Sequence, residues 1–221
     1  MQTPPWSFSS LTKFETCPLQ FYHVRVARDI VEPEGEAAKW GSRVHKHLEE
    51  RVRDGVPLPD EINYLEPVVT RIATTPHDSI HVERRYALDE NLTSVDWNSP
   101  VAWVRAIVDL ELRGRRGVVA FDWKTGKRKP GSDQLMLSAA IIMQESPEIN
   151  TVATGFLWLK ESKVDKEVFH REDLPRIWEG FIMRVERLNN AYAKDRWVAK
   201  PSGLCNGWCA VKQCEFWRPK R

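Results

Sequence analysis

The feature that most restricts the fold is a change of hydrophobic period before the middle of the chain. Residues 36–54 and 60–73 carry apolar side chains at the spacing of amphipathic helices. The period then falls to two, and three segments rich in Val and Ile follow at 79–88, 101–112 and 118–123. The stretch RGRRG between the second and third segments predicts a tight hairpin. We therefore expect three successive strands after the helices.

The second half of the chain alternates between the two periods. A strongly apolar helix is predicted at 131–145, followed by a strand at 151–159 and a shorter strand at 165–170. A long amphipathic helix is predicted at 174–197. This order of elements predicts the α/β (α+β) class, in which a central mixed β-sheet is flanked by helices.

The length of 221 residues is sufficient for one domain with a substantial core. We predict a single domain over 1–221, made of an N-terminal helical part (1–75), a core (76–197) and a cysteine-bearing tail (198–221). Ser9 or Ser10 is expected to cap a short first helix that ends at Glu15. Pro18 is expected to open the next helix, because proline is well tolerated in the first turn.

Composition excludes several classes of protein. The formal net charge is +2, so any contact with nucleic acid has to come from a local basic patch. No apolar run is long enough to cross a bilayer, and the N-terminal stretch MQTPPWSFSS lacks the regions of a signal peptide. These features predict a cytoplasmic protein without a membrane partner, whose four cysteines are reduced thiols.

The third predicted strand ends in the stretch AFDWKTGKRK, in which Asp122 and Lys124 are two positions apart. Side chains alternate along a strand, so these two charges share one face. The preceding strand carries Asp109 among apolar residues, and a hairpin would bring the two carboxylates close together. Buried carboxylates repel each other unless a positive group neutralises them. Lys124 supplies one charge, and a hard divalent cation such as Mg²⁺ would supply more.

Further residues could complete such a site. His45 and Glu49 are four residues apart on one helix face, and Glu83 is an acid on the first strand. Each group has a plain structural explanation, such as a surface ion pair, a buried acceptor of backbone hydrogen bonds or a packing histidine. Their order along the chain favours one shared site. Metal-assisted phosphodiester hydrolysis needs carboxylates that hold divalent ions and a lysine that positions the attacking water.

The same series resembles the RecB-like branch of the PD-(D/E)XK nuclease superfamily over nearly the whole chain. The matching stretches are SFSSLTKFETCPLQFY, GSRVH with His45, Glu83, VD with Asp109, DWKTGK, and DQL with Gln134. The resemblance implies a restriction-endonuclease-like core in αβββαβ order, which agrees with the elements above. It also implies that His45, Asp109, Asp122 and the main-chain carbonyl of Trp123 bind Mg²⁺ or Mn²⁺.

The resemblance implies catalytic roles for a set that comprises Glu83, Asp109, Asp122, Lys124 and Gln134. Lys124 would orient the attacking water or help to deprotonate it, and Gln134 would shape the site or contact the phosphate. One departure concerns a tyrosine that the family usually carries about one helical turn after the glutamine. No tyrosine lies between Gln134 and Gln144, so that supporting role is either vacant or filled by Ser138.

Three of the four cysteines, Cys205, Cys209 and Cys214, lie within ten residues near the C-terminus, and Cys17 is the fourth. Crowded thiols in a reducing compartment indicate metal ligands, and the residues alone leave an iron–sulfur cluster, zinc and no metal open. The AddB-type nucleases and exonucleases linked to CRISPR adaptation are similar, with one early and three late cysteines. The resemblance thus implies a [4Fe–4S] cluster that fastens the tail to the N-terminal helices, with structural Zn²⁺ as the alternative. The spacing departs from the family, which more often has a shorter first gap and a longer second one.

Basic residues lie close to the predicted site in the sequence. A basic rim around an acidic metal site suits a polyanionic substrate, although most such runs are solvated turns. The predicted DNA contacts are Arg115, Arg116, Lys127, Arg128 and Lys129, and further basic residues, Arg218, Lys220 and Arg221, close the chain.

The ten tryptophans are many for this length. Three of them lie in periodic segments and are expected to pack in the core. Three others are better candidates for stacking on single-stranded bases. The first set is Trp103, Trp158 and Trp178, and the second is Trp40, Trp208 and Trp217.

These features together predict a Mg²⁺- or Mn²⁺-dependent deoxyribonuclease, with an exonuclease on single-stranded DNA or DNA ends favoured. A bacterial, archaeal or phage-encoded enzyme of recombination, repair or phage or CRISPR-related DNA processing fits this prediction, alone, as an oligomer or with a recombination protein. The alternative is a catalytically inactive DNA-binding or assembly module with the nuclease fold. The presence of Asp109, Asp122 and Lys124 together counts against this alternative.

Overall fold

The computed structural model describes residues 3–115, 117–129, 131 and 133–220 of the chain. The chain forms two compact units. The core unit is Gly35–Trp178, and the terminal unit combines Met1–Glu34 with Glu179–Arg221. Helix α6 (Leu174–Lys194) begins in the first and continues into the second. The single domain predicted from the sequence stays a prediction. None of the described helices combines the length and the apolar character that a bilayer-spanning helix needs.

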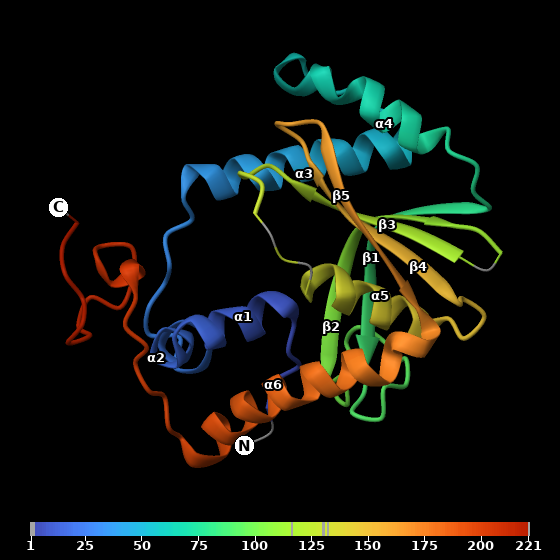
Figure 1. Ribbon diagram of the computed structural model, residues 1–221. Helices are drawn as coiled ribbons and strands as arrows, with labels where there is room; N and C mark the ends of the chain where they lie inside the picture. Colours follow the sequence, from blue (N-terminus) through green and yellow to red (C-terminus); the bar gives the residue numbers. More distant parts are fainter. Residues whose placement is uncertain (1–2, 116, 130, 132, 221) are drawn as a thin grey trace. The chain divides into compact units, whose positions relative to one another are not determined.

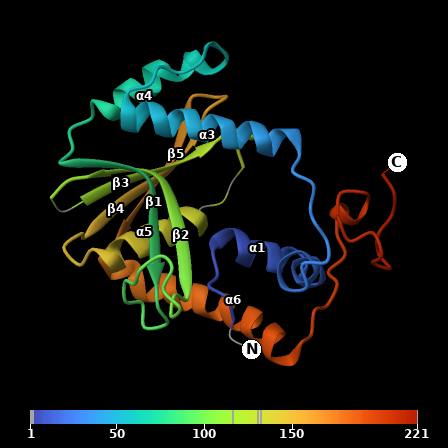
Figure 2. The ribbon, with the colours of Figure 1, turned by 180° about the vertical axis from the view of Figure 1, so that it is seen from behind.

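A five-stranded mixed sheet in the order β1-β2-β3-β4-β5 forms the centre of the core unit (Figures 1 and 2). The β3–β4 pair is parallel, and the other three neighbouring pairs are antiparallel. A parallel pair needs a crossover connection, which helix α5 (Asp133–Glu145) supplies. The arrangement confirms the predicted fold class. The strands are β1 (Ser79–Leu88), β2 (Val104–Arg113), β3 (Gly117–Lys124), β4 (Thr151–Trp158) and β5 (Lys163–His170).

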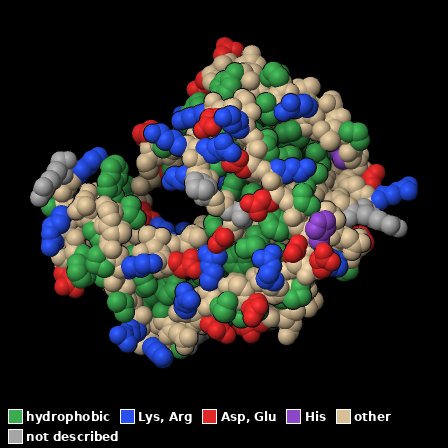
Figure 3. Space-filling model, viewed as in Figure 1, with side chains coloured by type: hydrophobic (Ala, Val, Ile, Leu, Met, Phe, Trp, Pro, Cys, Tyr) green, Lys and Arg blue, Asp and Glu red, His purple; other side chains and the backbone are tan. Residues whose placement is uncertain are grey.

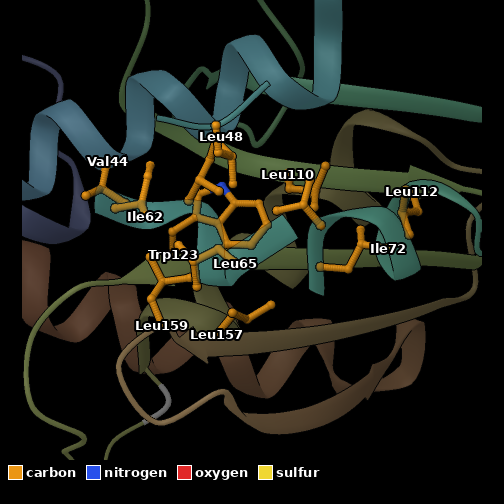
Figure 4. Packing of buried hydrophobic residues seen from close by; sticks show 12 residues of the cluster. Val44, Leu48, Ile62, Leu65, Ile72, Leu110, Leu112, Trp123, Leu157 and Leu159 are labelled. Atoms are coloured by element: carbon orange, nitrogen blue, oxygen red, sulfur yellow. The ribbon is translucent and has the colours of Figure 1, made fainter. Parts of the chain in front are cut away.

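Helices cover both faces of this sheet. Helices α3 (Glu36–Asp54) and α4 (Glu66–Ala73) pack on one face, where they enclose a hydrophobic cluster around Trp123 (Figure 4). Helix α5 packs on the other face and buries most of its apolar side chains. Because side chains alternate along β3, Asp122 points away from the Trp123 cluster and toward Gln134 of α5. Asp122 and Trp123, which are neighbours in the sequence, therefore lie on opposite faces of the sheet.

Three element boundaries in the middle and end of the chain differ from the predictions for local reasons. Strand β2 begins at Val104, because a turn in which Ala102 N donates to Ser99 O precedes it. The predicted helix 60–73 starts as a 3-10 helix, Asp60–Leu65, and becomes α-helical only at Glu66. Pro67 has no N–H to donate to the carbonyl one turn earlier, which breaks a continuous α-helix. Helix α6 ends at Lys194, where Asp195 takes a left-handed φ of 44°.

The first helix, α1 (Phe8–Thr16), is capped by Ser7 and not by Ser9 or Ser10. Ser7 Oγ accepts a hydrogen bond from Ser10 N at 3.3 Å, and Ser10 Oγ accepts one from Ser7 N at 2.8 Å. Ser10 is therefore the reciprocal partner in a capping box. The next helix, α2 (Pro18–Phe21), begins at Pro18 as predicted and passes into a π-helix, Tyr22–Val26.

Aromatic packing and the returning tail hold the terminal unit together. The Trp197 ring, after the end of α6, contacts four aromatic rings, those of Phe14, Phe21, Tyr22 and Tyr192. The tail then runs back along the first helices, where Lys200 Nζ donates to the Glu15 carbonyl at 2.7 Å. A 3-10 turn, Gly203–Cys205, begins the cysteine-rich segment.

Candidate active site

The candidate site lies at a fork, the place where strands β2 and β3 separate. Their pairing ends with Leu110 opposite Phe121, although a continued register would place Asp109 opposite Asp122. The backbone N–H of Trp123 instead donates to the Asp109 carboxylate, with 2.8 Å between N and Oδ2. An acidic side chain thus replaces a strand partner, and it brings the Asp109 carboxylate into the electrostatic range of Asp122.

Strand β1 contributes Glu83 through an unusual backbone conformation. The pairs Val82–Leu110 and Arg84–Val108 flank it, which places Glu83 level with Asp109. Glu83 has a φ of 50°, a left-handed value that is strained for a residue with a side chain. Val82 packs against the α3–α4 cluster, and yet the next residue, Glu83, lines a pocket with α3 as well. The strained residue therefore breaks the alternation and turns a second side chain toward α3.

Helix α3 contributes His45 and one wall of this pocket, which measures about 490 Å³. His45 Nε2 lies 2.8 Å from the carbonyl oxygen of Trp123. A carbonyl only accepts hydrogen bonds, so Nε2 carries the proton. The other ring nitrogen, Nδ1, faces Asp109 at 3.4 Å from Oδ2. The pocket is lined by Gly41, Ser42, His45, Lys46, Glu49, Glu83, Ile107 and Asp109.

Gly41 allows α3 to approach the turn that follows β3. A Cβ atom at this position would lie 3.2 Å from Thr125 Oγ1, which is closer than ordinary van der Waals contact. Thr125 directly follows Lys124. A side chain at Gly41 would therefore press on the segment that carries the acid–lysine pair.

The sequence-predicted ligands come together in part. Ligand atoms of His45, Glu83 and Asp109 lie within 4.8 Å of one another, the spacing that a single metal ion requires. Among the described residues, Asp122 is not a member of this group. The Trp123 carbonyl lies next to the group, but in this structure it accepts the His45 hydrogen bond.

Asp122 belongs to a second set of contacts on the α5 side. Its Oδ2 lies 2.7 Å from Lys124 Nζ, and its Oδ1 accepts a hydrogen bond from Gln134 Nε2 at 2.5 Å. The Gln134 amide oxygen in turn accepts from Lys124 Nζ at 3.1 Å. The ammonium also lies 4.8 Å from the centre of the Phe156 ring on β4. Lys124 is therefore fixed in position by three neighbouring groups.

Burial and crowding perturb the ionisation of every acid in the fork. Burial, with a further contribution from the Asp122 charge, raises the pKa of Asp109 to about 8. Burial also raises the pKa of Asp122, against the opposing effect of Lys124. The pKa of Glu83 is raised by burial and by the Glu49 charge. Burial lowers the pKa of His45, which keeps the imidazole neutral and able to bind a metal.

The chemistry of this donor set fits a hard divalent cation. The acids are costly to ionise together in a partly buried site, and a cation shared among them would remove that cost. Carboxylate oxygens are the ligands that Mg²⁺ and Mn²⁺ prefer, and a neutral imidazole is compatible with Mn²⁺.

The predicted DNA-contacting residues are scattered over exposed turns. Arg115 and Lys127 are exposed, and Arg116 lies outside the described residues. Arg128 forms an ion pair with Asp165 of β5, so part of its charge is neutralised. Arg128 and Lys129 line a second pocket of about 610 Å³, which also includes Phe156, the ring beside Lys124.

Sequence reasoning did not assign two kinds of site residue. Ser42 and Lys46 lie on the pocket face of α3. Ser42 is three residues before His45 and Lys46 is four residues after Ser42, and these helical spacings were a signal that could have identified them. The parallel pairing of β3 with β4 sets Asp122 opposite Phe156 and so brings Phe156 to the site. No local pattern in the sequence predicts this register. Ser138 donates to the Gln134 carbonyl inside the helix.

All four cysteines line one cavity in the terminal unit. Cys17 Sγ accepts a hydrogen bond from Lys200 N at 3.4 Å, and Cys205 Sγ accepts one from Ser202 N at 3.5 Å. Burial raises the pKa of the Cys209 thiol, and the other three cysteines add to this rise. No three of the described cysteine sulfurs lie within 4.8 Å of one another.

In this chain a mixed sheet carries two acids and a lysine at the point where two of its strands separate. This arrangement places the chain in the class of restriction-endonuclease-like folds. Comparison with protein families identifies the group within it. A model of the PD-(D/E)XK nuclease superfamily matches residues 5–214, and the chain belongs to this superfamily.

Solved structures give a more distant likeness. The crystal structure of a candidate exonuclease from Eubacterium rectale has a TM-score of 0.51 and 14% identity, covering 96% of this chain and 86% of that chain. The protein SSO0001 has a TM-score of 0.38 and 11% identity, covering 83% and 77% of the two chains. At 14% identity the likeness to the Eubacterium rectale protein concerns the fold alone. The likeness to SSO0001, with its lower TM-score, carries no argument. Comparison with curated proteins gives no match.

Proposed function

We propose that this protein is a Mg²⁺- or Mn²⁺-dependent deoxyribonuclease and that the fork is its active site. One observation carries the proposal: ligand atoms from α3, β1 and β2 converge within 4.8 Å, and an acid–lysine pair from β3 lies beside them. A divalent ion held there would activate a water molecule and stabilise the charge that develops on the phosphate.

The side chains of the fork would divide the work. His45, Glu83 and Asp109 would hold the ion, with His45 using Nδ1 because Nε2 donates to the Trp123 carbonyl. Asp122 would complete the ligand set from β3. Lys124, fixed by Asp122 and Gln134, would orient the attacking water toward the phosphorus.

Exonuclease action on single-stranded DNA or DNA ends is the form of the activity that we propose. The structural neighbour from Eubacterium rectale, itself named a candidate exonuclease, supports this form, as do the exposed residues Lys127 and Lys129 in the turn that follows Lys124. Recombination, repair or phage or CRISPR-related DNA processing in the cytoplasm is the proposed setting, with a second copy or a recombination protein as partner. The rival is an inactive DNA-binding or assembly module, against which the complete set of acids and lysine argues.

Cleavage assays on end-labelled linear and circular DNA separate these possibilities. We expect Mn²⁺ or Mg²⁺ to support release of nucleotides from linear single strands, and closed circles to remain intact. Asp122→Asn should abolish the release, whereas Glu90→Gln, which changes an exposed acid, should not. Cutting of circles would establish an endonuclease instead. Metal binding without cleavage of any DNA or RNA would establish the inactive module.

We propose further that the four cysteines hold a [4Fe–4S] cluster in the terminal unit. Their common cavity and the backbone N–H groups that point at Cys17 and Cys205 suit thiolate ligands. Four thiolates on one zinc ion would lie about 3.8 Å apart, given a Zn–S bond of about 2.3 Å. Among the described cysteines no three sulfur atoms lie within 4.8 Å of one another, which favours the larger cluster over Zn²⁺.

Metal analysis of anaerobically purified protein tests the cluster directly. We expect iron and acid-labile sulfide in about equal amounts, together with the visible absorption band of iron–sulfur centres. A colourless protein with one zinc ion per chain would contradict the cluster and support the alternative.

A further inference from the structure

We propose that the terminal unit carries a stacking platform for single-stranded nucleic acid, formed by Trp208 and Lys220. Trp208 is 66% exposed, although tryptophan is usually well buried. Of the predicted core tryptophans, Trp158 and Trp178 are buried and Trp103 is half-buried. Of the other two stacking candidates, Trp40 packs against the α3–α4 cluster, and Trp217 is half-buried with its indole N–H donating to the Cys209 carbonyl. Trp208 is therefore the stacking candidate whose ring the fold leaves in solvent.

The backbone holds this ring on a defined support. Trp208 N donates to the Leu204 carbonyl at 3.1 Å, and the returning end of the chain pairs with the same loop, with Arg218 N donating to the Cys205 carbonyl at 2.8 Å. Between them, Gly207 has a φ of 80°, and a Cβ there would lie 2.5 Å from Lys220 N. Only glycine permits this contact. The two segments that carry Trp208 and Lys220 thus lie directly against each other.

The lysine supplies charge where the ring supplies a stacking surface. Lys220 Nζ lies 4.1 Å from the centroid of the Trp208 ring, a cation–π contact over one ring face. Lys212 and Arg218 on the same segment are exposed as well, against one exposed acid, Glu215. Figure 3 shows Lys and Arg side chains along this C-terminal segment. The surface therefore combines an aromatic plane with a positive surplus.

Single-stranded nucleic acid is the ligand that this combination fits. Unpaired bases of any kind stack on an exposed indole, and the phosphates between them pair with nearby ammonium and guanidinium groups. Duplex DNA keeps its base faces stacked internally and cannot use the ring. The inference rests on the proposed function in taking nucleic acid as the polymer that the protein binds.

Binding of a fluorescent oligothymidine, measured by anisotropy with EDTA present so that no cleavage occurs, tests the platform. We expect Trp208→Ala to raise the Kd about tenfold and Trp208→Phe to raise it much less, because a phenyl ring still stacks. Lys220→Gln should reduce the slope of log K against log salt by about 0.7, the contribution of one phosphate contact. Met183→Ala, which trims another exposed hydrophobic residue of the terminal unit, is the matched control and should change neither quantity.

The outcomes separate this inference from the proposed function. Asp122→Asn should lose hydrolysis and keep oligothymidine binding, whereas Trp208→Ala should keep hydrolysis of a thymidine p-nitrophenyl phosphate ester. Iron and zinc contents are measured for each variant, because Trp208 is adjacent to Cys209. If Trp208→Ala alters them, Trp208→Phe and Lys220→Gln decide the question. An unchanged Kd and an unchanged salt slope in the Trp208 and Lys220 variants would overturn the platform. The exposed Trp208 ring would then be a contact for a protein partner instead.

Discussion

The fork in the core unit and the cysteine cavity in the terminal unit are both candidate metal sites, but they differ in what organises them. In the fork, polar side chains already contact protein groups: Asp109 accepts from Trp123 N, His45 donates to the Trp123 carbonyl, and Asp122 pairs with Lys124. In the cavity, the described hydrogen bonds to Cys17 and Cys205 come from backbone N–H groups alone.

This difference indicates what each site does without its ion. The fork can keep its shape through hydrogen bonds and protonated acids, so loss of the ion should remove chemistry before it removes structure. The cysteines come from the two ends of the chain, and only a shared metal would join them covalently. Metal binding there should therefore be coupled to folding of the terminal unit.

The largest expected effects concern catalysis at the fork, where our proposal gives Lys124 and Asp109 different tasks. Lys124→Ala should lower kcat by about 10²–10⁴-fold, because the water loses its orienting group, while Mn²⁺ binding is kept. Asp109→Asn should weaken Mn²⁺ binding itself, because it removes an anionic ligand from the group around His45. Isothermal titration with Mn²⁺ beside single-turnover kinetics distinguishes the two. Equal loss of metal binding in both variants would show that Lys124 does not have a separate role.

The next largest effect concerns the cysteine cavity. Cys209→Ser should release the bound metal and lower the free energy of unfolding of the terminal unit by at least about 3 kcal/mol. The exposed Lys212 on the same loop should then be cut rapidly by trypsin. The core unit should keep its own unfolding transition, which calorimetry measures. Lys212→Gln is the control for changes on this loop, and a Cys209→Ser protein with normal tail protection would refute a metal-dependent fold.

A pH effect of intermediate size follows from the raised pKa of Asp109. Burial and the Asp122 charge raise that pKa from an ordinary value of 3.8 to about 8, so the metal-free protein holds the proton at pH 7. Mg²⁺ affinity should thus rise with pH until about pH 8 and level off above it, and binding at pH 7 should release close to one proton. Titrations in buffers of different ionisation enthalpy measure that proton directly. No proton release at pH 7 would contradict the shifted pKa.

The raised pKa of Asp109 also predicts how the stability of the metal-free protein changes with pH. A group whose pKa is higher in the folded state stabilises the fold at low pH, and this contribution is lost as pH rises through the folded-state pKa. Asp109→Asn should therefore be more stable than wild type by about 1–2 kcal/mol at pH 9, with a smaller difference at pH 5. Denaturation at the two pH values checks the sign.

The sequence allowed much of this architecture to be predicted, and the failures have physical causes. The bounds of α3 and β1 were predicted correctly because clear signals mark them, such as the left-handed Gly55 that ends α3. His45, Asp109 and Asp122 were proposed as site residues from residue type and order, and their role stays a prediction. The position of Glu83 could not be derived from alternation, because its left-handed φ reverses the pattern at that one residue. Likewise, Phe156 lies near Lys124 only through the parallel register of β3 and β4, which no local pattern encodes.

The smallest expected effect tests whether the fork depends on the close approach of α3. Gly41→Ala places a Cβ at 3.2 Å from Thr125 Oγ1, so the helix has to shift by a few tenths of an ångström and move His45 relative to Asp109. We expect a several-fold weaker Mn²⁺ affinity and a loss of stability below about 1 kcal/mol. Thr125→Ala removes the opposing oxygen, so the double variant Gly41→Ala, Thr125→Ala should regain most of the affinity. If the effects of the two changes on Mn²⁺ affinity are additive instead, the distance between α3 and the turn after β3 does not control the site. The sheet alone would then determine the geometry of the fork.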